Sequence, residues 1–234
     1  MVKSVGTGFL KMLNIKPAES AKQQTESSHK KSVCLTSSYL APVEYYVAIA
    51  NAENVLLERF DSYEKQTYRN RCKILTANGI YALTIPVEKQ SGVKILMRDV
   101  RISEHKDWQL QHWRSIESAY NSTPFFEYYK DDFLPFFEKK WDFLWDFNQE
   151  LQAKVIELLE LKPIITLTSE YQKSLNTDIL DFRESMHPKK QKSLISLKPY
   201  YQVFESRFGF QANLSIVDLL FNMGNESQLI IQSL

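Results

Sequence analysis

The feature that most constrains the fold is a strand–helix–strand pattern in residues 33–60. Residues 33–36 form a short apolar run that predicts a first strand, and residues 55–60 form a second one. Between them, Pro42 stands where a helix can begin without losing a hydrogen bond. The residues that then share one helical face are Tyr45, Ile49 and Ala52. A helix between two strands favours parallel pairing of those strands.

Turn signals and apolar runs divide the rest of the chain. Strands are predicted at residues 80–85, after the turn pair Asn78-Gly79, and at 100–102 and 164–167. Helices are predicted behind a possible N-cap at Asp107, over 148–161 and over 214–221. We therefore predict an α/β fold, in which a small, mostly parallel sheet from residues 33–105 carries flanking helices and the C-terminal half is helical.

Composition separates a leader from one folded domain. The chain has 234 residues, 44% of them hydrophobic, which is enough for a single domain over residues 33–234. Residues 1–31 carry six Lys against two Glu, net +4, and residues 17–32 lack large hydrophobic side chains. Residues 1–32 are thus expected to be a disordered basic leader. Its apolar positions within residues 1–16 leave a membrane-surface role open as an alternative.

Several function classes are disfavoured. A net charge of +1 gives no field that would attract nucleic acid, and no apolar run approaches the ~20 residues that span a bilayer. Two cysteines are too few for a disulfide framework, which indicates a cytoplasmic protein. The glycine motifs of dinucleotide-binding, P-loop and serine-hydrolase proteins are absent. The four histidines have no metal-ligand spacing, and neither a cofactor nor an oligomeric state is indicated.

Residues 63–74 place two tyrosines, two amides and four cations within one short run. Burying so many donors without partners is unfavourable, so the run suits a polar, anionic ligand. If the run is extended, alternate side chains share a face, with Gln66, Tyr68 and Asn70 on one side and Arg69 and Arg71 on the other. The alternative is a hydrogen-bond network that ties this strand to its neighbour.

A series of motifs along the chain resembles one family. The run 63–74 is followed by Asn78-Gly79 and by the segment 83–87, Leu-Thr-Ile-Pro-Val. Further along come 113–116, Trp-Arg-Ser-Ile, then 124–126, Pro-Phe-Phe, then 201–204, Tyr-Gln-Val-Phe, and finally 213–224, Asn-Leu-Ser-Ile-Val-Asp-Leu-Leu-Phe-Asn-Met-Gly. Their order and spacing resemble the WbqC-like family of bacterial proteins over about residues 33–227.

The resemblance implies a reaction class. Members of that family often lie in gene clusters for O-antigen or other surface polysaccharides and are described as transferases, sometimes as glycine transferases acting on sugars. Two departures stand out in this chain. The Gln-Pro-x-Tyr-Phe-Pro type of segment is replaced by residues 36–42, and the acids that end the second strand, Glu58 and Asp61, are separated by two residues.

Three side chains are candidates for acid–base catalysis. Glu58 and Asp61 follow the second strand, at the edge where α/β proteins usually place catalytic groups. Either could act as a general base, and the alternative is an ion pair with a nearby Arg or Lys. His112, one helical turn from Trp108, is a third candidate base, with a structural role as the alternative. Cys72, beside a cation, stays open as a nucleophile.

Three further regions each carry more than one interpretation. Asp218 and Asn222 share a face of the last predicted helix and could close the site, or could simply cap and pack that helix. Residues 171–198 could be a lid or a solvated loop. The aromatic run at 125–147 could stack sugars, face a membrane, dock a partner or fill the core.

We therefore predict a group transferase of the glycine or acyl type, acting on a sugar or nucleotide-sugar in surface-polysaccharide biosynthesis. Arg71, with Arg69, would hold an anionic donor or a nucleotide-sugar phosphate. The side chains that would orient the acceptor are Gln66, Tyr68 and Asn70. The alternative is a non-enzymatic accessory protein of the same pathway that binds a sugar or a partner.

Overall fold

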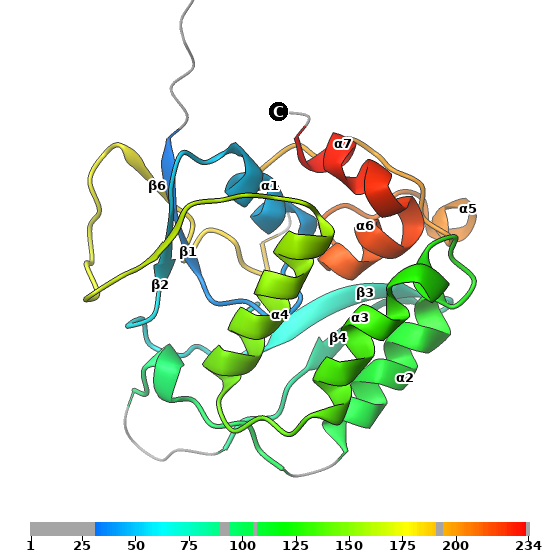
Figure 1. Ribbon diagram of the computed structural model, residues 1–234, viewed down its shortest axis with the longest axis horizontal. Helices are drawn as coiled ribbons and strands as arrows, with labels where there is room; N and C mark the ends of the chain where they lie inside the picture. The colour runs from blue at the N-terminus through cyan, green and yellow to red at the C-terminus, as the bar shows by residue number, and fades with distance from the viewer. Residues whose placement is uncertain (1–30, 89–93, 105–106, 191–193, 233–234) are drawn as a thin grey trace, which may run out of the picture.

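The structure is a computed structural model that describes residues 31–88, 94–104, 107–190 and 194–232 (Figure 1). The predicted leader and its membrane-surface alternative lie almost wholly outside these residues. A four-stranded parallel sheet runs in the order β5 (Ile165–Leu167), β2 (Val55–Glu58), β1 (Ser32–Thr36) and β6 (Ile179–Asp181). All three strand pairs are parallel, which confirms the pairing predicted for the first two strands.

Helix α1 (Val43–Asn51) connects the two central strands. Pro42 is its N-cap residue, as the sequence predicts. The apolar side chains of β1 and β2 and nearly all of α1 are buried, since a parallel sheet is covered by its crossover helices. The register pairs Thr36 with Glu58, so the C-terminal ends of β1 and β2 lie side by side.

A second sheet is a hairpin of β3 (Arg71–Thr76) and β4 (Gly79–Thr84). Gly79 has a φ of +103°, a value that a glycine adopts without strain. The α/β class and the small parallel sheet are confirmed, and strands are present where they were predicted at 80–85 and 164–167. The parallel sheet does not lie within residues 33–105 as predicted, because β3 and β4 form a separate antiparallel pair and two strands of the parallel sheet come from beyond residue 160. Residues 100–102 form isolated bridges only, so the strand predicted there is wrong.

Three long helices cover the hairpin and the parallel sheet: α2 (Trp108–Tyr120), α3 (Phe126–Glu138) and α4 (Leu144–Leu158). In Figure 1, α2 and α3 lie together beside the hairpin, and α4 lies between them and the parallel sheet. Three short helices close the chain: α5 (Glu205–Phe208), α6 (Ile216–Met223) and α7 (Ser227–Ile231). The 3₁₀ turns are η1 (Met97–Asp99) and η2 (Gly224–Glu226).

The aromatic run of residues 125–147 forms much of the core. Its buried rings include Phe126, Tyr129, Phe133, Phe137 and Phe147. Several of them meet edge to face, among them Phe126 and Phe133 against Phe221 of α6. This is the core-packing interpretation of the run, and Tyr128 is its most exposed ring.

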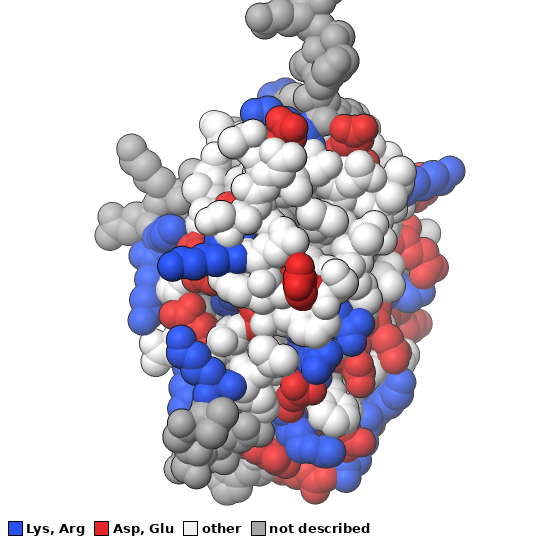
Figure 2. All heavy atoms as spheres, turned by 90° about the vertical axis from the view of Figure 1, so that its left-hand side faces the viewer, with Lys and Arg blue, Asp and Glu red and all other residues white. Residues whose placement is uncertain are grey.

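The surface on the side of the parallel sheet carries charges of both signs (Figure 2). Lys and Arg residues alternate with Asp and Glu residues over its lower part, and the upper part is mainly uncharged. This face therefore has no extended field of one sign. Within the described ranges, no helix is both long enough and apolar enough to span a bilayer.

Candidate functional site

The candidate site begins where β2 ends. Glu58, its last residue, is 1% exposed, and its side chain is fully engaged. One carboxylate oxygen accepts hydrogen bonds from the Phe60 N–H and the Thr168 hydroxyl, both at 2.8 Å. The other oxygen accepts from Arg183 Nη1 at 3.1 Å. Glu58 is therefore held by a cation and two neutral donors from three segments.

Arg183 connects Glu58 to β6. Its guanidinium donates to Asp181 in a two-pronged contact, with Nε–Oδ1 at 2.9 Å and Nη2–Oδ2 at 2.6 Å. It also lies over the ring of Tyr171, 4.9 Å from the centroid. A buried arginine thus fixes the ends of two strands and the aromatic side chain above them.

Asp61 is the second acid after β2, and it is 3% exposed. Its Oδ2 accepts from Arg69 Nε at 3.0 Å and from Arg69 Nη2 at 2.6 Å. Its Oδ1 has no hydrogen-bond partner among the described residues. Burial raises the pKa of the Asp61 carboxyl, and the neighbouring Arg69 opposes that rise only in part. Asp61 is therefore an oriented carboxylate with one free oxygen and increased basicity.

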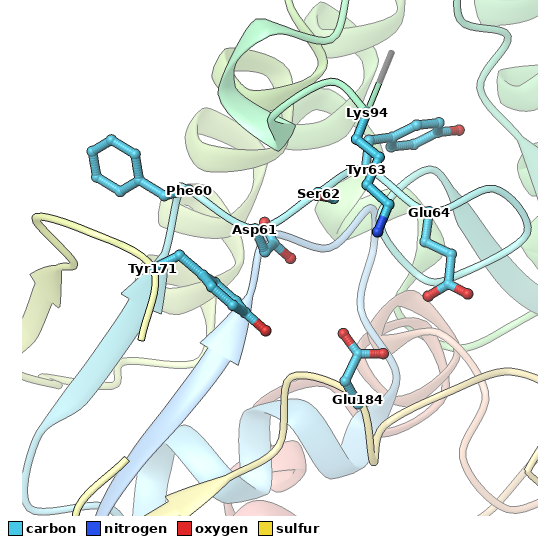
Figure 3. Close-up of a pocket in the computed structure, with 8 residues that line it drawn as sticks. All are labelled: Phe60, Asp61, Ser62, Tyr63, Glu64, Lys94, Tyr171 and Glu184. Carbon is cyan, nitrogen blue, oxygen red and sulfur yellow. The ribbon is translucent and has the colours of Figure 1, made fainter. Parts of the chain in front are cut away.

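A cavity of about 440 Å³ opens in front of Asp61, and Figure 3 labels the residues that line it. The Tyr171 hydroxyl, the Lys94 ammonium and the carboxylates of Glu64 and Glu184 extend toward a common space beside Asp61. The ring of Phe60 points away from that space. The lining thus joins three carboxylates, one cation and two tyrosines, which suits a ligand with several hydrogen-bond donors and a ring.

The run at 63–74 is not extended as predicted. Residues 65–70 form turns, and β3 begins only at Arg71. Gln66 has a φ of +63°, and the Thr67 hydroxyl donates to the Glu64 carbonyl at 2.8 Å. Such local side-chain bonds compete with strand formation, so the alternating faces predicted for the run do not exist.

The other residues of that run bind to protein neighbours. The Tyr68 carbonyl accepts from the Tyr39 N–H at 2.9 Å, and burial raises the pKa of the Tyr68 phenol. Asn70 donates to the Ile85 carbonyl at 2.8 Å, and its side-chain oxygen has no partner among the described residues. Arg71 donates to the Thr84 hydroxyl at 3.0 Å. The cavity takes Tyr63 and Glu64 from this run, while the ligand roles predicted for Gln66, Tyr68, Asn70 and Arg71 stay predictions.

His112 lies apart from the two acids. It is buried on α2, and its Nδ1 is 3.0 Å from the Tyr39 hydroxyl, with Trp108 edge-on to its ring. Burial lowers the pKa of His112 to about 4, although a hydrogen bond to the Thr84 backbone opposes this. His112 is therefore neutral at pH 7 and does not line the cavity around Asp61.

Asp218 and Asn222 lie in a buried network of α6. The Asp218 carboxylate accepts from the Tyr120 and Tyr200 hydroxyls at 3.0 and 2.8 Å, and from Gln202 Nε2 at 2.8 Å. Burial raises its pKa to about 6, against those three hydrogen bonds. Asn222 accepts from the backbone N–H of Val203 at 3.2 Å. These contacts match the packing alternative, and neither residue lines the cavity.

Sequence reasoning missed Lys94, Tyr171 and Glu184, which belong to segments remote from β2 in the chain. A partial signal existed for the last two, since residues 171–198 contain paired acidic and basic side chains. Cys34 and Cys72 are fully buried, and burial raises both thiol pKa values. In the ranges that the structure describes, no group of three or more His, Cys, Asp or Glu side chains is arranged to hold a metal ion.

Comparisons with known proteins give one family. The model described as "WbqC-like protein family" matches residues 37–193, which include Glu58, Asp61 and the whole cavity lining. The uncharacterized protein Rv1507c of Mycobacterium tuberculosis is 23% identical over 225 residues, covering 85% of this chain and 96% of that protein. No solved structure matches the chain.

Proposed function

The chain belongs to the WbqC-like protein family, and we propose that it transfers a glycyl or other acyl group to a sugar or nucleotide-sugar in surface-polysaccharide biosynthesis. In this proposal the acceptor binds in the cavity in front of Asp61. The observation that carries it is Asp61, which lines the cavity and whose buried Oδ1 has no hydrogen-bond partner among the described residues. A buried oxygen without a partner is unfavourable unless a ligand donates to it.

Asp61 is suited to act as the general base. An amine or hydroxyl of the acceptor donates its proton to Oδ1 while its nitrogen or oxygen forms a bond to the acyl carbon of an activated donor. The bond between that carbon and the donor's leaving group then breaks, and the leaving group departs with the electron pair. Arg69 holds Oδ2 and so keeps Oδ1 oriented, and the raised pKa makes Asp61 a stronger base than an ordinary carboxylate.

The rest of the lining suits a sugar. Tyr171 offers a ring face and a hydroxyl group, and Glu64 and Glu184 offer acceptors for sugar hydroxyls. Among the described residues, Lys94 is the cation of the lining and can balance part of the charge. A buried ion pair fixes Asp61 in advance, whereas Glu184 is largely exposed.

The second candidate is a non-enzymatic accessory protein that binds the same sugar without transferring a group. The cavity supports this reading equally well as a binding site. Its predicted docking surface, the aromatic run of residues 125–147, is instead mostly buried. That burial favours the transferase over an accessory protein that docks through this run.

The test is a ligand screen followed by a transfer assay on the full chain. Thermal unfolding is measured with nucleotide-sugars, free nucleotides, acyl-CoA and aminoacyl donors. A ligand at about 100 times its Kd stabilises the fold by about 2.7 kcal/mol, a clear shift in Tm. Acceptors that bind are then incubated with each donor, and mass spectrometry detects an acceptor that has gained the acyl group. Binding with no transfer from any donor would support the accessory protein instead.

A further inference from the structure

A second hollow, of about 430 Å³, adjoins the cavity through Phe60. Phe60 is part of the cavity lining, but its ring points away from the cavity (Figure 3). Two arginines that lie over this ring, Arg59 and Arg98, line the second hollow. Its other lining residues are Asp99, Phe143, Trp145 and Asp146.

Aromatic rings orient the arginines of this hollow. The guanidinium carbons of Arg59 and Arg98 lie 5.2 and 4.7 Å from the Phe60 centroid. Phe143 of the lining is itself covered by Arg101, which is not a lining residue and lies 4.6 Å from the Phe143 centroid. A guanidinium stacked on a ring is partly desolvated and keeps its N–H edges available for a ligand. The N–H groups of such a guanidinium can donate two parallel hydrogen bonds to two oxygens of one phosphate group.

The arginines of the hollow make few ion pairs. Arg59 forms none with any residue in the described ranges, and the Arg59 Nε is buried there without a partner. Arg98 pairs with Asp99 at 3.5 Å, but both side chains are more than a third exposed, so this contact contributes little. Asp146 is the second carboxylate at the hollow, so the lining has two arginines and two carboxylates.

The start of a long helix lies at the same hollow. Trp145 and Asp146 belong to the first turn of α4, and its N-cap residue makes no side-chain hydrogen bond to that turn. The Leu144 N–H donates to the Val100 carbonyl at 2.9 Å, and the other N–H groups of the first turn carry a partial positive charge that favours anions. Trp145 is half-buried at the hollow and offers part of its indole to a planar group.

We propose that Arg59 and Arg98 bind the phosphate groups of a nucleoside diphosphate, with its base against Trp145. This places the anion site away from Arg69 and Arg71, whose side chains donate to Asp61 and Thr84. A sugar attached to the diphosphate would then extend past Phe60 into the cavity in front of Asp61. That last step rests on the proposed function, whereas phosphate binding does not.

The test is calorimetric titration of the full chain with uridine diphosphate, inorganic pyrophosphate and uridine. Uridine diphosphate and pyrophosphate are both expected to bind, and uridine is expected to bind far more weakly. Arg59→Gln and Arg98→Gln are each expected to raise the Kd for uridine diphosphate about tenfold or more, because each removes a charged hydrogen-bonding group. Arg114→Gln is the matched control, because Arg114 is exposed on α2. In this variant the Kd for uridine diphosphate should change less than twofold. Trp145→Leu should weaken binding of the nucleotide and leave pyrophosphate unchanged.

Two results would overturn the proposal. One is that neither uridine diphosphate nor pyrophosphate binds at millimolar concentration in low salt. The other is that both arginine variants bind as the wild type does, with circular dichroism showing that they are folded. The phosphate site and the proposed function can fail independently. Nucleotide binding without any transfer would contradict only the proposed function. Transfer that persists at wild-type KM in both arginine variants would contradict only the phosphate site.

Discussion

Replacing Arg183 with methionine is expected to destabilise the fold by about 3 kcal/mol. Arg183 is 4% exposed and gives the 1%-exposed Glu58 its only ion pair in the described residues. Removing one partner of a buried pair typically costs about 3–5 kcal/mol, because the other charge is left uncompensated. Glu58 would still accept from Phe60 and Thr168, so the lower end of that range applies. The contact with Asp181 adds at most about 1 kcal/mol, because that carboxylate is partly exposed.

A double-mutant cycle separates the pair from general packing. Glu58→Gln leaves Arg183 paired with Asp181 and should cost less, about 1–2 kcal/mol. The double variant should cost clearly less than the two single variants together, because no buried charge is then left alone. Urea unfolding at pH 7 gives each free energy, with the m-value as a check on two-state behaviour. The reasoning is refuted if Arg183→Met changes the stability by less than 0.5 kcal/mol, as an ordinary surface change does, or if the two single changes are additive.

Three other perturbations test the buried groups. Because the folded pKa of Asp218 is about 6 and its unfolded value about 3.9, folding stability should fall by up to about 3 kcal/mol as pH rises from 4 to 6. Urea unfolding across this range should show that loss in the wild type but not in Asp218→Asn. Gly224→Ala should lower the unfolding free energy by about 1–3 kcal/mol, because a Cβ there would lie 2.6 Å from Phe125 at a φ of +55°. Cys34 and Cys72 should react with a thiol reagent only after unfolding, since both are buried with raised pKa values.

Each of these has its own control or contrary result. For Asp218, a pH slope that is the same in wild type and variant would show that its proton is not linked to folding. Gly209→Ala is the matched control for Gly224, because its φ is also positive but nothing lies within 4 Å of the added carbon. Equal losses at the two glycines would show that contact with Phe125 contributes nothing. Rapid labelling of either thiol in the native protein would contradict its burial.

The elements that could be predicted are those whose signal is local. The strand, helix and strand of residues 33–60 follow from apolar spacing and from Pro42, and the structure has all three. Of the two edge strands, β5 was predicted at 164–167 but not its place in the sheet, and β6 was not predicted, because both pair with residues far along the chain. Glu58 bonds to Thr168, 110 positions away, and to Arg183, 125 positions away. Nothing in a short window identifies such a partner.

The candidate site was predicted in part. The order of acids after β2 identified Asp61, and the alternative that it pairs with Arg69 is also observed. These two readings are compatible, because the pair uses Oδ2 and leaves Oδ1 free. The failure at Gln66 has a local cause, since turn bonds of Thr67 replace the strand that an alternating polar pattern suggested. The stacked arginines at Phe60 gave no sequence signal, because a cation beside an aromatic residue is common on any surface.

The central claim is that Asp61 takes a proton from the acceptor during transfer. The most direct measurement is the rate of acyl transfer, under saturating substrates, in wild type and in Asp61→Asn, with Glu117→Gln as a control on the exposed face of α2. The account predicts that kcat falls by about 10²–10⁴ in Asp61→Asn, that acceptor binding is largely kept and that the control is unchanged. A kcat for Asp61→Asn within a factor of three of wild type would contradict the claim.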